Sequence, residues 1–263
     1  MPTGVPGLDE VLHGGLAPGR VYLLDGTPGT GKTTAGLQFL LEGARRGEAC
    51  LYVALSETAE ELAQAARSHG WSLDGIGIAD LVPTEAELDA IGADQSVFDP
   101  AELEATETVQ RIVARVEAAR PTRLVVDSLA ELRLRAGSPL RFRRQVLSLK
   151  HRLAAQGRTI LLLDDQTAAE PDQQIRTIAH GVITLEKMPA EYGADRRRLR
   201  VLKLRAADHR TGCHDYAVRR GGMTVFPRLP VATAPAGFRA EGPGEPLEAG
   251  LAELDSLLGG GPR

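Results

Sequence analysis

Residues 20–34 read RVYLLDGTPGTGKTT, and this stretch decides the fold. Its first half contains an apolar run, Val21 to Leu24, that predicts a short buried strand. Its second half, Gly26 to Thr33, fits the pattern G-x-x-x-x-G-K-[ST] at every fixed position. Glycines let such a loop fold so that its backbone N–H groups point inward at a polyphosphate. The strand before it and the helix after it favour a phosphate-binding loop over a glycine-rich turn that binds nothing.

The side chains of this loop predict a site for a nucleoside triphosphate and Mg²⁺. Lys32 supplies a positive charge for the β- and γ-phosphates, and the Thr33 hydroxyl is suited to ligate Mg²⁺. A helix predicted over residues 32–45 directs the positive end of its dipole at the same anion. The residues that we expect to bind the nucleotide here are Thr27, Pro28, Gly29, Thr30, Gly31, Lys32, Thr33 and Thr34.

The composition suits one α/β domain with an appendage. The chain has 263 residues, 43% of them hydrophobic, and a formal net charge of −4, which argues against a dedicated nucleic-acid binder. Its two cysteines are too few for a disulfide framework, and Cys50 lies in an apolar run that predicts a reduced core thiol. We see no signal peptide and no apolar run of membrane-spanning length, so we expect a cytoplasmic protein.

Downstream of the loop, apolar runs alternate with amphipathic helical segments. Continuous apolar strands that alternate with helices predict a parallel sheet covered on both faces, and the β-rich stretch from residue 181 predicts an antiparallel extension. Residues 83–103 are acidic and predict an exposed loop. The predicted strands cover residues 50–55, 76–82, 124–126, 159–163, 182–186, 199–205, 214–219 and 223–226, and further helices are predicted at 58–68, 104–119 and from 138 onward.

Polar pairs follow three of the parallel strands, namely Ser56-Glu57, Asp127-Ser128 and Asp164-Asp165. Ligands of such sheets bind at the carboxyl ends of the strands, where these pairs and the phosphate loop should gather. We expect Asp127 to hold Mg²⁺ through water or through Thr33. Glu57 is the candidate to orient the attacking water, unless it only caps the helix at 58–68. Asp164 and Asp165 are rival candidates for that role. Two other roles are open to them, namely sensing the γ-phosphate and capping a helix.

Several stretches resemble the RecA-like ATPases of the KaiC and RadA group, and most of all a single KaiC-type domain. The resemblance covers about residues 3–229 and implies a P-loop ATPase that uses ATP and Mg²⁺. The stretches that carry it are TGVPGLDEVLHGGL (3–16), GTPGTGKTT (26–34), the SET at 56–58, RSHGWSLDGI (67–76), RLVVDSL (123–129) and VLKLRAADH (201–209).

The resemblance also implies a homo-oligomeric ring, usually a hexamer, with ATP between subunits. The segment that acts on the neighbouring subunit's nucleotide in this family matches Lys203, Leu204, Arg205 and His209. Lys203 and Arg205 alternate on a predicted strand and so point to one face, where they would stabilise charge on the γ-phosphate. A solvated strand edge is the alternative for this pair.

Two departures from the family pattern bear on activity. The family typically carries paired glutamates where this chain has Ser56-Glu57, so hydrolysis is expected to be slow. Residues 206–208 read AAD where the family has small and hydroxyl residues, so one contact to the nucleotide is expected to be missing. Autokinase activity is not expected, because in KaiC it belongs to the second domain.

The end of the chain echoes its beginning. Residues 254–261, LDSLLGGG, parallel residues 8–15, LDEVLHGG, which precede the first strand. Coincidence between two Leu/Gly-rich stretches is the alternative explanation. We therefore predict three parts: an ATPase domain at 1–229, a linker at 230–249 rich in Pro, Ala and Gly, and a truncated start of a second similar domain at 250–263.

Three functions fit these patterns. The leading one is a slow ATPase that works as a nucleotide-driven ring and signalling or timing switch, with a protein partner. A RadA- or RecA-like DNA-dependent ATPase would use the basic stretch Arg133 to Arg144, where recombinases place DNA loops, and Arg196 to Arg198. Only Phe142 accompanies them as an aromatic residue, which favours subunit contacts or a solvated face over nucleic acid. The third is an assembly scaffold with little hydrolysis.

Overall fold

A computed structural model describes residues 1–82, 100–154, 156–166, 173–190 and 192–229 of the chain. All elements discussed below belong to one compact unit, Met1–Arg228. The predicted linker, the echo of the N-terminal segment and most of the predicted acidic loop lie outside the described residues.

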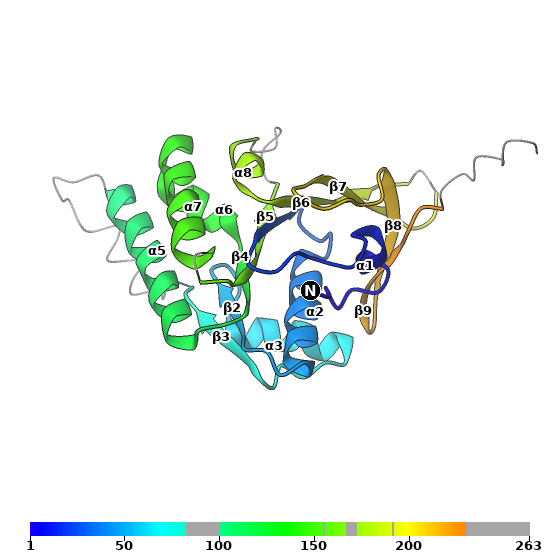
Figure 1. Cartoon of the computed structure of the whole chain (residues 1–263), viewed down its shortest axis with the longest axis horizontal. Coiled ribbons are helices and arrows are strands. Elements are labelled where there is room, and N and C mark those ends of the chain that lie inside the picture. Colours follow the sequence, from blue (N-terminus) through cyan, green and yellow to red (C-terminus); the bar gives the residue numbers. More distant parts are fainter. Residues whose placement is uncertain (83–99, 155, 167–172, 191, 230–263) are drawn as a thin grey trace, which may run out of the picture. The chain divides into compact units, whose positions relative to one another are not determined.

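The described part forms a nine-stranded sheet in the order β3-β2-β4-β5-β1-β6-β7-β8-β9 (Figure 1). The pairs from β3 to β6 are all parallel, and the pairs from β6 to β9 are antiparallel. The expected parallel sheet with an antiparallel extension is confirmed. The strands are β1 (Val21–Gly26), β2 (Cys50–Ala54), β3 (Ile76–Asp80), β4 (Arg123–Asp127), β5 (Thr159–Asp165), β6 (Gly181–Met188), β7 (Arg196–Leu204), β8 (Cys213–Arg219) and β9 (Gly222–Phe226).

One strand was assigned to the wrong part of the sheet. The sequence pattern placed β6 in the antiparallel extension, whereas β6 pairs parallel with β1. The cause is a helix between β5 and β6, over Gln173–Ile178, that the sequence analysis missed. This helix makes a crossover past β1, and a crossover returns the chain parallel to the strand it left. Only β7 to β9 form the antiparallel extension.

Helices cover both faces of the sheet, as the apolar strands predicted (Figure 1). One buried cluster joins the sheet to α1, α2 and α3, and the other joins the opposite face to α5, α6, α7 and α8. The missed helices are α6, which follows β4 at once, and α8. The helices are α1 (Leu8–Val11), α2 (Lys32–Arg45), α3 (Ala59–His69), α5 (Pro100–Ala119), α6 (Leu129–Ala136), α7 (Pro139–Ala154) and α8 (Gln173–Ile178).

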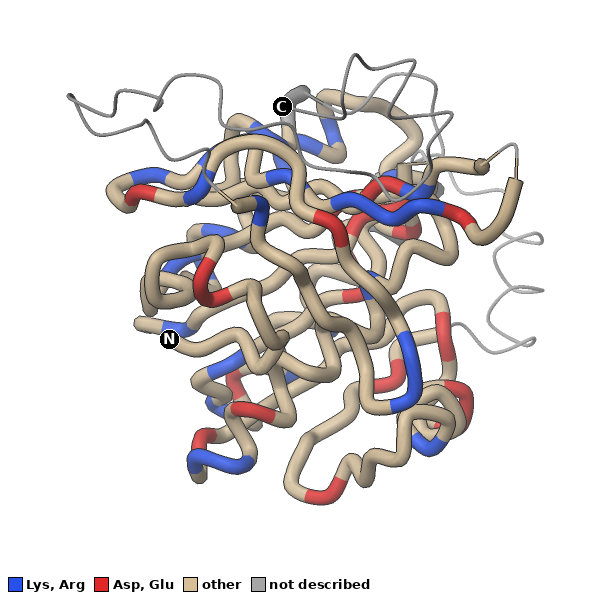
Figure 2. The backbone as a smooth tube through the Cα atoms, turned by 90° about the vertical axis from the view of Figure 1, so that its right-hand side faces the viewer, with Lys and Arg blue, Asp and Glu red and all other residues tan. Residues whose placement is uncertain are grey.

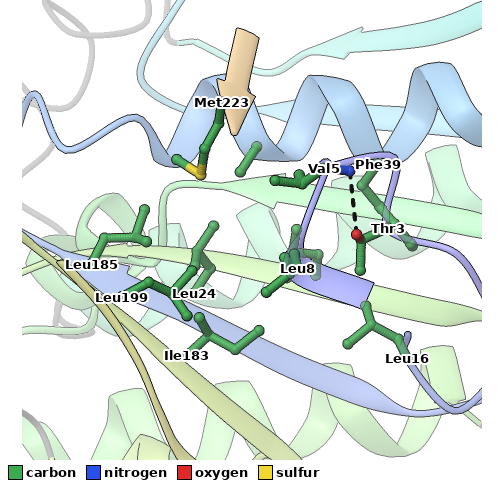
Figure 3. A pocket seen from close by; sticks show the side chains of 12 residues that line it. Thr3, Val5, Leu8, Leu16, Leu24, Phe39, Ile183, Leu185, Leu199 and Met223 are labelled. Carbon is green, nitrogen blue, oxygen red and sulfur yellow. Dashed lines mark hydrogen bonds between the residues drawn. The ribbon is translucent and has the colours of Figure 1, made fainter. Parts of the chain in front are cut away.

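The N-terminal segment, residues 1–16, packs into the buried cluster that also contains apolar residues of α2. The Val225 amide of β9 donates to the carbonyl of Pro6, and the Val5 amide donates to Thr3 Oγ1. Gly7 has φ +78°, and a Cβ there would lie 2.0 Å from the carbonyl oxygen of Val225, so only glycine fits. Apolar side chains of this segment and of the sheet surround a small cavity of about 20 Å³ (Figure 3). The segment therefore acts as a structural cover.

Candidate functional site

The strand ends that were expected to converge do so. An open pocket of about 410 Å³ lies where β1, β2, β4 and β5 end, within the size range of ligand sites. Strands β7 and β8 each contribute one residue to its lining, Arg197 and Val218. The pocket is lined by Pro28, Gly29, Gly31, Lys32, Thr33, Thr34, Ser56, Glu57, Asp127, Asp165, Arg197 and Val218.

The phosphate loop is folded around Lys32. Gly29 and Gly31 have φ of +77° and +97°, which glycine adopts without strain, and α2 begins at Lys32. The Lys32 side chain is 6% exposed, and its Nζ donates to the carbonyls of Gly26 at 2.9 Å and Thr27 at 3.1 Å. The same Nζ lies 2.6 Å from Asp165 Oδ1. The ammonium group thus points into the pocket and has a carboxylate partner there.

Two residues that were expected to bind the nucleotide, Thr27 and Thr30, do not line the described pocket. Thr30 is fully buried, and its hydroxyl donates to the Thr27 carbonyl at 2.8 Å. The Tyr216 hydroxyl of β8 donates to the Thr30 carbonyl, also at 2.8 Å. Thr27 and Thr30 are not among the described residues that line the pocket. The Thr30 hydroxyl and the carbonyls of Thr27 and Thr30 therefore shape the loop.

The two predicted metal ligands lie side by side. Thr33 Oγ1 donates to Asp127 Oδ2 at 3.0 Å, and the Tyr52 hydroxyl donates to the same oxygen at 2.5 Å. Burial raises the pKa of Asp127, while the bonds from Tyr52 and Thr33 lower it. Burial and the nearby Asp127 hold the pKa of Tyr52 well above its usual range, so Tyr52 stays a donor. The donors of Thr33 and Asp127 are oxygen atoms, which Mg²⁺ prefers, so these residues fit the expected ion.

Glu57 lies half-buried in the same pocket. Burial raises its pKa, and the charges of Asp127, Glu61 and Asp165 raise it further. A raised pKa brings a carboxylate closer to the range where it can accept a proton at neutral pH. Thr58 and Glu61 form the capping box at the N-terminus of α3. Capping of this helix therefore does not explain why Glu57 lies in the pocket.

Of the two aspartates at the end of β5, only one faces the pocket. Asp165 contacts Lys32 there. Asp164 points to the opposite face, where its Oδ2 lies 2.6 Å from Arg133 NH2 of α6. Burial raises the pKa of Asp164, and its bond with Arg133 lowers it. Alternation along a strand produces this division, and it leaves Asp165 as the remaining candidate for a role at the phosphates.

The predicted trans-acting residues lie away from their own chain's pocket. Lys203 and Leu204 end β7, and none of Lys203, Leu204, Arg205 and His209 lines the pocket among the described residues. Lys203 and Arg205 both bind backbone carbonyls at the C-terminal end of α8. The His209 amide donates to Asp208 Oδ1. Lys203, Leu204, Arg205 and His209 are therefore absent from the described lining of the pocket that holds Lys32.

Arg197 is a pocket residue that the sequence analysis missed. Its NH1 donates to the carbonyl of Gly29 in the phosphate loop at 2.8 Å. Its neighbour Arg196 instead forms an exposed ion pair with Asp215 of β8. Successive strand residues point to opposite faces, so the run Arg196 to Arg198 could have been divided into residues that face the loop and residues that do not.

The basic stretch Arg133 to Arg144 is helical and contains no extended DNA loop. It spans the end of α6, a turn, and the start of α7. Arg133 binds Asp164 and lies 4.8 Å from the centre of the Phe142 ring, so part of its charge is used within the fold. In the view of Figure 2, basic and acidic segments interleave along the described backbone.

Among the described helices, none has the length and apolar character needed to cross a membrane.

Comparisons with known proteins point in one direction. A family model described as "ATPase: KaiC" matches residues 1–229. A UPF0273 protein of Pyrococcus horikoshii is 31% identical over 236 residues, which cover 86% of this chain and 93% of the relative. The circadian clock oscillator protein KaiC of Synechococcus elongatus is 28% identical over 276 aligned positions, and the match covers 99% of this chain and 50% of KaiC. The chain thus spans half the length of KaiC.

The fold has a counterpart among solved structures. The crystal structure of a KaiC-like protein from Pyrococcus horikoshii OT3 matches with a TM-score of 0.71 and 27% sequence identity. The match covers 86% of this chain and 98% of that chain. The expected RecA-like α/β fold is therefore confirmed.

Proposed function

We infer the function from a premise that the comparisons establish: the chain belongs to the KaiC family of ATPases. We propose that it binds ATP with Mg²⁺ and hydrolyses ATP slowly, as a homo-oligomeric ring whose nucleotide state changes its affinity for a protein partner. The curated KaiC relatives are named circadian clock oscillator proteins, which supports a switch. Because the chain spans half of their length, both the protein partner and the biological process are proposals.

One observation carries the proposal. A single pocket holds the phosphate-loop lysine, the threonine–aspartate pair and a carboxylate with a raised pKa. Lys32 and the loop amides would bind the phosphates, and Arg197 would add a second positive charge beside Gly29. Thr33 and Asp127 would hold Mg²⁺, which when bound neutralises phosphate charge.

Glu57 is the proposed acceptor of the proton of the attacking water. Its side chain lies in the pocket, and its raised pKa suits this work. Ser56, in place of a second carboxylate, leaves Glu57 to orient the water alone, which is our reason to propose slow turnover. Replacing Glu57 by Gln should lower turnover by roughly a hundredfold and leave binding intact, as expected for loss of a general base.

Lys203 and Arg205 are proposed to act on the nucleotide of a neighbouring subunit. Neither residue belongs to the described lining of its own chain's pocket, and both side chains reach the carbonyls at the end of α8, which supports this role. Lys32→Ala should abolish ATP binding. Lys203→Ala and Arg205→Ala should reduce turnover and largely keep binding, and a parent rate in both would refute the trans site.

The deciding experiment is steady-state phosphate release from Mg-ATP, with and without single-stranded DNA. A slow rate that DNA does not change supports the switch. Strong stimulation by DNA would replace it with the recombinase function and would assign the basic α6–α7 surface to DNA. ATP binding without any release would leave an assembly scaffold.

The domain division is part of the same proposal. We propose that residues 1–229 are one ATPase domain and that residues 230–249 link it to the start of a second copy at 250–263. The sequence echo of residues 8–15 and the double length of KaiC support this division. A fragment of residues 1–229 should still bind ATP, and loss of binding in that fragment would contradict the division.

A further inference from the structure

Helix α8 has a cluster of cations at its C-terminal end. The last carbonyls of a helix lack partners within it and carry partial negative charge, so cations bind there favourably. Lys203 Nζ uses three such acceptors, and Lys150 and Arg205 use others. The bonds run from Lys203 to the carbonyls of Arg176 (2.8 Å), Thr177 (3.2 Å) and Ala179 (2.7 Å), from Lys150 to Ile178 (2.7 Å), and from Arg205 to Thr177 (3.2 Å).

The same helix is tied to the strand that carries the phosphate loop. The Arg176 guanidinium donates twice to Asp25 Oδ2, from Nε at 3.0 Å and from NH2 at 2.7 Å. Asp25 is 3% exposed and directly precedes Gly26, the first residue of the loop. Arg176 thus binds β1 through its side chain and Lys203 through its own carbonyl.

The tie to Asp25 is hard to replace within the described residues. Asp25 lies in register with Asp164 of β5 and Thr184 of β6, on one face of the sheet. Asp25 Oδ1, Asp164 Oδ1 and Thr184 Oγ1 are buried and have no hydrogen-bond partner among those residues. Without Arg176, the Asp25 carboxylate would be a buried charge beside a second carboxylate, which is strongly unfavourable.

The cations at α8 need the helix in turn. Burial lowers the pKa of Lys203, and the nearby charges of Arg205 and Lys150 lower it further. Three cations this close repel one another unless acceptors compensate. The α8 carbonyls are those acceptors, so the place of the helix determines where Lys203 and Arg205 can lie.

We infer that Arg176 is a positioning residue for the trans contact: it fixes α8 to β1, and α8 in turn fixes the positive charges of Lys203 and Arg205 that act on the neighbouring subunit's nucleotide. This inference rests on the proposed trans role of those two residues. Asp25 points to the face covered by α5 to α8, whereas α2 carries Lys32 on the opposite face. We therefore expect a chain without the Arg176 side chain to be less stable, to keep the phosphate pocket on the other face, and to present misplaced cations to its neighbour.

The first test compares full-length variants in turnover of Mg-ATP and in nucleotide affinity. Arg176→Met should lower turnover about tenfold, as a lost coupling of this kind does, with affinity changed by less than about twofold. Arg176→Lys can keep one bond to Asp25 and should recover part of the rate; it also decides the matter if Arg176→Met does not fold. Arg196→Met, which removes an exposed Arg–Asp pair elsewhere, is the matched control and should keep the parent rate.

The second test separates action in trans from a structural effect. Arg176→Met is co-expressed with Lys32→Ala, which binds no nucleotide but supplies intact cations. Mixed assemblies should regain turnover, because loaded pockets of one variant face intact cations of the other. Turnover that stays lost in the mixture, or a parent rate for Arg176→Met alone, overturns the inference. If Lys203→Ala also hydrolyses ATP at the parent rate, the proposed trans role fails with it, whereas a slow Lys203→Ala leaves that role standing.

Discussion

The ion pair between Lys32 and Asp165 should compete with the nucleotide. Lys32 Nζ lies 2.6 Å from Asp165 Oδ1 in a pocket where the lysine is 6% and the aspartate 27% exposed. A triphosphate has to draw this ammonium group away from Asp165 and also places its own negative charge near the carboxylate. Asp165→Asn keeps the size of the side chain and removes the charge, so it should tighten binding.

The size of the effect follows from the contact that is weakened. A hydrogen bond to a charged group contributes about 1.5–3 kcal/mol. Lys32 keeps its bonds to the carbonyls of Gly26 and Thr27, and the asparagine still accepts from it, so we take the lower end. Because about 1.4 kcal/mol corresponds to a factor of ten, Asp165→Asn should bind the Mg complex of a non-hydrolysable ATP analogue roughly tenfold more tightly.

Isothermal titration calorimetry at fixed ionic strength measures this change directly. The matched control is Asp164→Asn, one residue away but on the opposite face of the sheet, bound to Arg133. It should lower the stability of the fold and leave nucleotide affinity unchanged. Equal or weaker binding by Asp165→Asn would refute the reasoning, since Asp165 would then assist nucleotide binding.

Two further predictions concern buried polar groups. Tyr52→Phe removes the hydroxyl bond to the buried Asp127 and should lower the free energy of unfolding by about 2 kcal/mol, measured by urea denaturation; an unchanged midpoint would contradict it. Burial and the nearby charges of Lys150 and Arg20 lower the pKa of His180, so the folded state favours its neutral form. Its contribution to stability should be complete above pH 6.5, the ordinary value, and be lost as the pH falls below it, and His180→Asn should flatten that part of the stability profile.

The sequence predicted the elements whose signal is local. Helix α2 occupies residues 32–45 as expected, because the loop before it and the apolar periodicity within it fix both ends. The capping box of α3 forms between Thr58 and Glu61 as the spacing implies. The parallel pairing of the strands from β1 to β5 followed from apolar strands that alternate with helices, whereas their order in the sheet was not predicted.

The errors share a physical cause, which is dependence on distant contacts. Helix α8 has six residues and is held by side chains from β1, β7 and α7, so its own sequence carries a weak signal. Missing it placed β6 in the wrong part of the sheet. Arg197 lies beside the phosphate loop because β7 and β8 fold back over it, an approach that local sequence does not encode.

The charge of the pocket gives a reason why Mg²⁺ and the nucleotide should arrive together. Three carboxylates, Glu57, Asp127 and Asp165, line the pocket with only two cations among its described residues, Lys32 and Arg197. A free triphosphate would add further negative charge to a site that already has an excess of it. Bound Mg²⁺ would lower that charge, and Thr33 and Asp127 would offer it oxygen donors. The carboxylates that would disfavour a free triphosphate are thus the groups that we expect to favour its magnesium complex.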